Sequence, residues 1–90
     1  MEFVADKKVL TTDEQERIAR GSDVNQRMLL ARRPKLDLYV MGILAKDSEE
    51  KVRMELAQYC RHKGLLRYLQ KCDPSMKVRQ SVELNPLLKG

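Results

Sequence analysis

Residues 27–31, Arg27-Met28-Leu29-Leu30-Ala31, return 26 residues later as residues 53–57, Arg53-Met54-Glu55-Leu56-Ala57, and a weaker copy follows at residues 79–83. The same step joins apolar residues into two columns. The columns are Val4, Leu30, Leu56 and Val82, and Leu10, Leu36 and Leu88 with a break at His62. A period of this size is typical of stacked repeats, in which one small unit cannot bury its own apolar face and its neighbours cover it. We therefore expect one domain, residues 1–90, built from repeated units.

Each repeat divides into two short helices. Apolar residues in the range 36–46 recur at spacings of three and four, and a second such stripe follows in the range 49–60. The same pattern recurs one period earlier and one period later. The predicted helices are 12–20, 23–33, 36–46, 49–60, 64–72 and 74–84, and residues 2–9 are expected to be the second half of an incomplete hairpin. The sequence thus predicts an all-α fold, a short right-handed α-solenoid of about three helical hairpins.

Residues that commonly cap helices separate the predicted elements. Thr11 and Glu14 have the spacing of a capping box, in which each side chain accepts from the other residue's backbone amide. Asp73 precedes Pro74, which places a preferred cap before a proline at the first helical position. Asp47-Ser48 is expected to cap the helix at 49–60 in the same way.

The residues around two of these turns resemble a known family. Leu44-Ala45-Lys46-Asp47 with Val52-Arg53, and Cys72-Asp73-Pro74 with Val78-Arg79, are similar to the leucine-rich repeat variant and HEAT-like repeats. In that pattern an aspartate in the hairpin turn precedes a Val-Arg pair by five and six residues. The resemblance implies that such side chains form a ladder joining successive hairpins, and the matching residues are Asp47, Arg53, Asp73 and Arg79. The first copy departs from the pattern, because Gly21 stands where the aspartate belongs and Gln26 where the valine belongs, and Ser22 or Asp23 is the candidate substitute for the aspartate.

Composition narrows the class of protein. The hydrophobic content of 42% includes no Trp and one Phe, so aliphatic side chains and Met must fill the core, as in helical proteins. No run of residues is long and apolar enough for a membrane span, and the first residues do not follow the order of a signal peptide, so we expect a cytoplasmic protein. Cys60 and Cys72 are then expected to be free, buried thiols. A zinc site at Cys60, His62 and Cys72 would need a fourth ligand and closer spacing, so we expect no metal and no cofactor.

Basic and acidic residues fall at different positions of the repeat. The chain has 18 basic and 13 acidic residues, yet no acidic residue lies between Asp23 and Asp37 or between Glu55 and Asp73. Stacking is expected to place the turns between hairpins on one edge. These two stretches also contain Arg27; we call their other cations the basic set: Arg32, Arg33, Lys35, Arg61, Lys63, Arg67 and Lys71. The turns within hairpins, at residues 22–23 and 47–50, are acidic and are expected on the opposite edge.

Two interpretations of the basic set remain open. Cations at the end of each second helix complement the negative end of the helix dipole. Lys63, Arg67 and Lys71, however, step by four along one helix face, where their mutual repulsion is mildly destabilising. They form either a solvated face or an anion-binding surface.

The sequence favours a binding role over catalysis. The single histidine, His62, has no nucleophile placed beside it in a defined dyad, so we expect no enzymatic activity. We expect a protein-protein interaction module, of adaptor or inhibitor type, that binds an acidic partner surface through the basic set. The alternative is weak DNA or RNA binding through the same residues. Tyr68 beside Arg67 is suited to stack on a base, although packing in the core is the favoured use of a single Tyr. Self-association through uncapped ends is a further option, because apolar residues lie near both ends of the chain: Phe3, Val4, Val9, Leu84, Leu87 and Leu88.

Overall fold

The computed structural model describes residues 9–89, which form seven helices and no strand. The helices are α1 (Thr12–Ala19), α2 (Val24–Ala31), α3 (Leu38–Ala45), α4 (Glu50–Tyr59), α5 (Lys63–Cys72), α6 (Met76–Glu83) and α7 (Pro86–Lys89). The predicted all-α class is confirmed, and no predicted bound of the first six helices differs from the observed one by more than two residues. The helix predicted at residues 2–9, with Phe3 and Val4, lies outside the described residues except for Val9.

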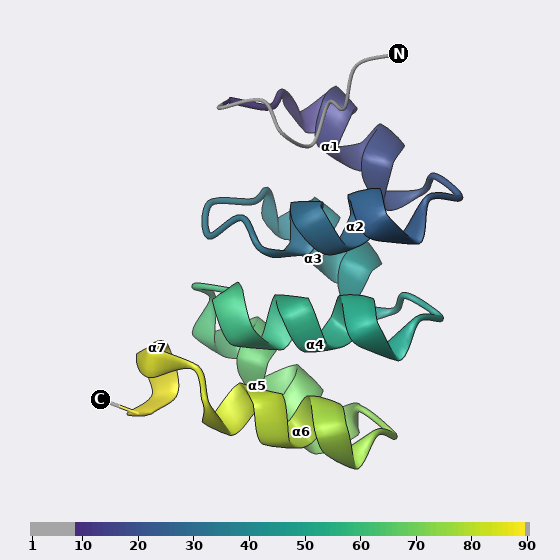
Figure 1. Cartoon of the computed structure of the whole chain (residues 1–90). Coiled ribbons are helices and arrows are strands. Elements are labelled where there is room, and N and C mark those ends of the chain that lie inside the picture. Colours follow the sequence, from purple (N-terminus) through teal and green to yellow (C-terminus); the bar gives the residue numbers. More distant parts are fainter. Residues whose placement is uncertain (1–8, 90) are drawn as a thin grey trace.

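The first six helices are arranged in two layers. In one layer α2, α4 and α6 pack side by side, and in the other α1, α3 and α5 follow one another in the same direction (Figure 1). The turns within the pairs α1–α2, α3–α4 and α5–α6 all lie on one edge of the molecule. The turns that connect one pair to the next lie on the opposite edge, where α7 is also found (Figure 1). The result is a compact body of 37 × 24 × 18 Å.

The core lies between the two layers and is aliphatic. Leu30, Leu56 and Val82, which share one column of the sequence, have no exposed surface. In the second column Leu10 and Leu36 are buried, whereas the break at His62 is an exposed residue. His62 instead caps the start of α5, and its Nδ1 atom accepts a hydrogen bond from the backbone amide of Leu65.

The predicted helix caps are partly confirmed. Thr11 and Glu14 form the expected capping box at the start of α1. The cap predicted at Asp73 is wrong, because α6 begins two residues later and its cap is Ser75, which accepts from the amide of Val78 at 3.3 Å. Asp73 ends α5 instead, and its carboxylate accepts from the amide of Ser75 at 2.9 Å.

The turn before α4 is arranged like the turn before α6. The cap position belongs to Glu49, whose side chain makes no capping bond, so the cap predicted at Asp47-Ser48 is wrong as well. Asp47 accepts from the amide of Glu49 at 2.9 Å, as Asp73 does from Ser75. Both aspartates therefore shape the turn before the helix and do not cap the helix itself.

The two cysteines differ in burial. Cys60 is 1% exposed, as predicted, and burial raises the pKa of its thiol. Cys72 is exposed, so the prediction that it is buried is wrong. It lies on the outer side of α5, near the turn between α3 and α4. Within residues 9–89 no three His, Cys, Asp or Glu side chains are grouped as a metal ion requires. No helix of that part of the chain is long and apolar enough to cross a membrane.

Candidate functional site

Arg53 and Asp73 form a nearly buried ion pair between two successive helix pairs. The Nε atom of Arg53 in α4 lies 2.8 Å from Oδ2 of Asp73, and its Nη2 atom lies 3.4 Å from Oδ1. The side chains are 13% and 2% exposed, respectively. The third nitrogen of Arg53, Nη1, donates at 2.6 Å to the backbone carbonyl of Asp47. One arginine thus joins the turn of its own pair to the turn of the next.

Arg27 makes the same set of contacts one pair earlier. Its Nε atom lies 2.7 Å from Oδ2 of Asp47, and its Nη1 atom donates to the carbonyl of Gly21 at 2.6 Å. The glycine at position 21 does not disturb this contact, because Arg27 binds the backbone carbonyl of Gly21 and needs no side chain at that position. Arg27 was absent from the predicted ladder, although its position 26 residues before Arg53 was a signal that could have identified it.

Arg79 is the last of the three arginines, and its contacts are incomplete. Its Nη1 atom donates to the carbonyl of Asp73 at 2.7 Å, as Arg53 donates to Asp47. No carboxylate among residues 9–89 pairs with Arg79. We call Arg27, Arg53 and Arg79, with their aspartates, the arginine ladder, and its last position lacks an acidic partner within the described part of the chain.

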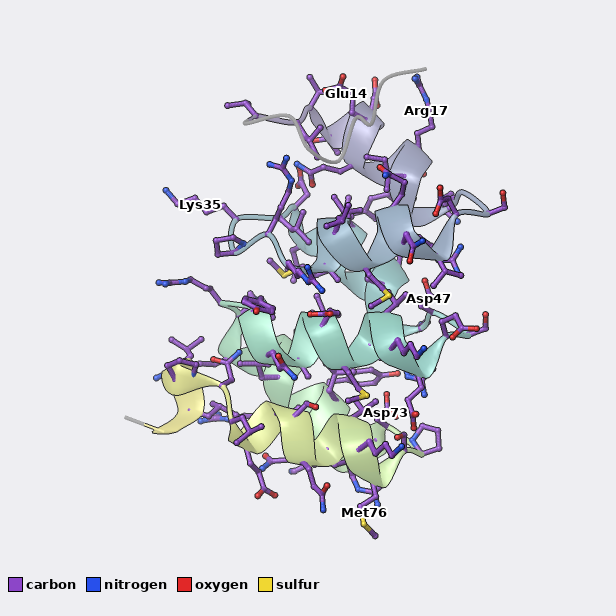
Figure 2. All side chains as sticks on the ribbon, in the orientation of Figure 1. Glu14, Arg17, Lys35, Asp47, Asp73 and Met76 are labelled. Atoms are coloured by element: carbon purple, nitrogen blue, oxygen red, sulfur yellow. The ribbon has the colours of Figure 1, made fainter. Side chains whose placement is uncertain are left out.

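The basic set does not form one continuous edge. Lys35 extends from the edge opposite to Asp47 and Asp73 (Figure 2), and Arg61 lies in the turn between α4 and α5 on that same edge. Arg32 also lies there. Its Nη2 atom is 2.9 Å from Glu55, and this hydrogen bond raises the pKa of Arg32. Arg33 is half-buried in the same turn.

The remaining three cations lie along α5. Lys63 is at its first residue and Lys71 is near its last, so the row crosses the molecule toward the edge that holds Asp73. An α-helix rises 1.5 Å per residue, which spreads the row over roughly 12 Å. Lys63, Arg67 and Lys71 are all exposed, and none has an ion-pair partner among the described residues.

Two cations of the row, Arg67 and Lys71, occupy positions that are buried in the preceding helix pair. Arg67 corresponds to Met41, which is 5% exposed and whose Sδ atom lies 3.7 Å from Sγ of Cys60. Lys71 corresponds to Ala45, also 5% exposed. Both counterparts are buried, whereas no further pair within residues 9–89 covers α5 and α6 (Figure 1). Arg67 and Lys71 therefore lie on the end of the stack.

The same replacement of apolar by polar residues extends over both helices at this end. Leu44 in α3 corresponds to Gln70 in α5, and the fully buried Ala57 in α4 corresponds to Glu83 in α6. We call this surface the end face. Its members are Arg67, Gln70, Lys71, Met76, Arg79, Gln80 and Glu83.

The apolar residues expected near this end are only partly exposed. Leu87 and Leu88 of α7 pack against the core, whereas Leu84 is 62% exposed. Met76 is 63% exposed and points away from the stack at the end opposite to Glu14 and Arg17 (Figure 2).

Asn85 holds α7 in place. Its side chain is buried, and Nδ2 donates to the carbonyls of Ala57 and Cys60 at 2.9 Å each and of Gln58 at 3.1 Å. Next to it, an open groove of about 650 Å³ lies between α7 and the turns on this edge. Arg61 is the cation that lines it, together with Pro34, Gln58, Tyr59, Cys60, Leu84, Asn85, Pro86 and Leu87.

In comparisons with known proteins, no protein-family model, no curated protein and no solved structure matches the chain.

Proposed function

We propose that this chain is a non-enzymatic protein-protein interaction module, of adaptor or inhibitor type, that binds an acidic surface of a partner protein through the basic set. The proposal rests on one observation, which is that the positive charge in α5 and in the turn before it has no acidic partner among the described residues. Residues 56–72 contain no Asp or Glu. Four cations of the basic set lie there, exposed and without ion-pair partners among the described residues: Arg61, Lys63, Arg67 and Lys71.

Charge of this kind suits the recognition of an acidic protein. Three cations of the chain are already paired: Arg27 with Asp47, Arg53 with Asp73, and Arg32, itself a member of the basic set, with Glu55. Those pairs stabilise the fold, whereas the exposed cations retain their charge for a partner. Complementary charge speeds association and selects partners, and its effect weakens as salt screens it.

We also propose that the paired helices are a short right-handed α-solenoid with a 26-residue repeat, of the leucine-rich repeat variant or HEAT-like kind. The starts of α2, α4 and α6 at Val24, Glu50 and Met76 support this repeat. A stack of this kind holds its surface cations in fixed positions, as a binding module requires. We place the protein in the cytoplasm, where free thiols such as Cys60 and Cys72 persist.

Nucleic-acid binding is the second candidate, and one observation favours it. Tyr68 is 42% exposed and adjoins Arg67, so an aromatic ring and a cation are both accessible on α5. Such a pair can stack on a base and contact a phosphate. The ring also lies against the turn between α3 and α4, which gives it a packing role that needs no nucleic acid.

A matched pair of variants tests the proposal. One variant reverses the charges of the proposed site, with glutamate in place of Arg61, Lys63, Arg67 and Lys71. The control reverses four exposed cations elsewhere, with glutamate in place of Arg17, Lys46, Lys51 and Lys77. Each set of four replacements changes the net charge by −8, from +5 to −3, so the two variants differ only in where the charge lies. After circular dichroism has verified that both are folded, only the first is expected to lose the native partner.

A further inference from the structure

The arginine ladder is open at Arg79. Arg27 and Arg53 each bind a backbone carbonyl through Nη1 and a carboxylate through Nε and Nη2. Arg79 makes the backbone contact at 2.7 Å, close to the 2.6 Å of Arg53. Its Nε and Nη2 atoms have no carboxylate among residues 9–89, where Asp47 and Asp73 serve the other two.

The surroundings of Arg79 attract anions. Arg67 and Lys71 of α5 share the end face with Arg79, and the acidic member of that face is Glu83. A solvated terminal surface explains polar residues at this end, but mixed charges of both signs would serve solvation equally well. The excess of cations is therefore left unexplained by solvation alone.

We propose that the acidic partner protein docks on the end face and places an Asp or Glu side chain on Nε and Nη2 of Arg79, the position that Asp47 and Asp73 take on the other two arginines. This inference rests on the proposed function and identifies where on the chain the partner binds. The planar fork of an arginine matches the two oxygens of a carboxylate. Met76, which is 63% exposed beside the fork, adds an apolar contact.

A second copy of the chain does not fit this position in the same register. The residue that corresponds to Asp47 and Asp73 in the first helix pair is Gly21, which has no carboxylate. A copy that continued the stack would present Gly21 to Arg79, and the nearby Asp23 is engaged as the cap of α2, where it accepts from the amide of Gln26. The positive charge of the end face favours a partner protein with an acidic side chain at the point of contact.

The test uses the full chain and a short oligo-aspartate peptide with blocked ends as the probe. The binding constant and the Nε–H resonance of Arg79 are followed by NMR. We expect saturable binding that shifts this resonance together with the amides of α5 and α6. Arg79→Lys keeps the charge but removes the fork, and it should weaken binding roughly fivefold. Lys77→Gln is the control, because residues two apart lie on nearly opposite sides of a helix, and it should leave the binding constant unchanged.

Several results would overturn the inference. They are an absence of saturable binding, equal affinity of wild type and Arg79→Lys, or an equal loss in Lys77→Gln. An oligothymidylate of matched charge that binds more tightly in an Arg79-dependent way would identify a nucleic acid as the ligand. Dimers in analytical ultracentrifugation that Arg79→Lys abolishes would identify a second copy. If the fourfold reversal at Arg61, Lys63, Arg67 and Lys71 abolishes binding while Arg79→Lys does not, the proposed function stands and the role of Arg79 falls. Thermal unfolding of Arg79→Lys and Arg79→Gln shows that each variant is folded.

Discussion

Replacing Asp73 by asparagine tests the energetic weight of the arginine ladder. The substitution keeps the shape of the side chain and the acceptor for the amide of Ser75, but it removes the charge that faces Arg53. The carboxylate is 2% exposed and the guanidinium 13%, so solvent compensates little of the loss. Hydrogen bonds between charged groups contribute about 1.5–3 kcal/mol, and breaking a buried pair by removing one partner costs about 3–5 kcal/mol. Because asparagine still accepts a hydrogen bond, we expect a loss of about 2–3 kcal/mol for Asp73→Asn.

Urea unfolding followed by circular dichroism measures this loss. A loss of this size would lower the melting temperature by roughly 10–20 °C in a domain of this length. Glu83→Gln, an exposed acid on α6, is the control and should stay within about 0.5 kcal/mol of wild type. A double-mutant cycle with Arg53→Gln should give a coupling free energy of about 1–2 kcal/mol. The reasoning is refuted if Asp73→Asn is as stable as Glu83→Gln, or if the coupling free energy is near zero.

Three further predictions concern other parts of the fold. Asn85→Ala leaves three carbonyls at the end of α4 without their donor, so it should lower the free energy of unfolding by about 2 kcal/mol in urea. It should also speed hydrogen exchange at the amide of Leu87, which Asn85 accepts from. Unchanged exchange at Leu87 would contradict the role of Asn85 in holding α7. Cys72 should react rapidly with a thiol reagent near neutral pH, whereas Cys60 should react only on unfolding, because it is buried and its pKa is raised. Since the unfolded chain then loses the Cys60 proton at lower pH than the folded chain, stability should fall above about pH 9, and Cys60→Ala should flatten that fall. Thr11→Ala should destabilise by about 1 kcal/mol through loss of the capping box, and an unchanged urea midpoint would refute that role.

The sequence predicted the helices well because apolar spacing directly records which helix faces are covered. It failed at the start of α6, where Asp73 before Pro74 has every local feature of a cap. The carboxylate of Asp73 is occupied by Arg53 from the preceding helix pair and by the amide of Ser75, so the cap passes to Ser75. A contact between residues 20 positions apart outweighed the local preference, and local sequence patterns do not contain that contact.

The pairing within the ladder was also hidden from the sequence. The step of six from Asp47 to Arg53 matches a contact in the structure, but that contact joins the arginine to the backbone carbonyl of Asp47. The carboxylate that Arg53 binds belongs to Asp73, in the next helix pair. Spacing alone does not determine whether an arginine reaches backward or forward along a stack.

The sequence also predicted the position of the cations only in part. The acid-free stretch from Glu55 to Asp73 correctly indicated an exposed row of positive charge. The spacing by four placed Lys63, Arg67 and Lys71 on one helix, but the expectation of a single basic edge did not include that this helix runs across the molecule, away from the edge of Lys35. Which face of α5 remains uncovered depends on where the stacking of helix pairs stops, and that is a property of the assembled fold.

The measurement that tests the proposed function most directly is affinity capture from the native cell lysate. Wild type, the variant reversed at Arg61, Lys63, Arg67 and Lys71, and the net-charge-matched control are compared at low and high salt, with and without nuclease, and bound proteins are identified by mass spectrometry. We predict one stoichiometric, acidic protein that resists nuclease, is released at high salt, and is lost only from the first variant. Retention of that protein by the first variant with unchanged salt dependence would contradict the account, as would recovery of nucleic acid alone.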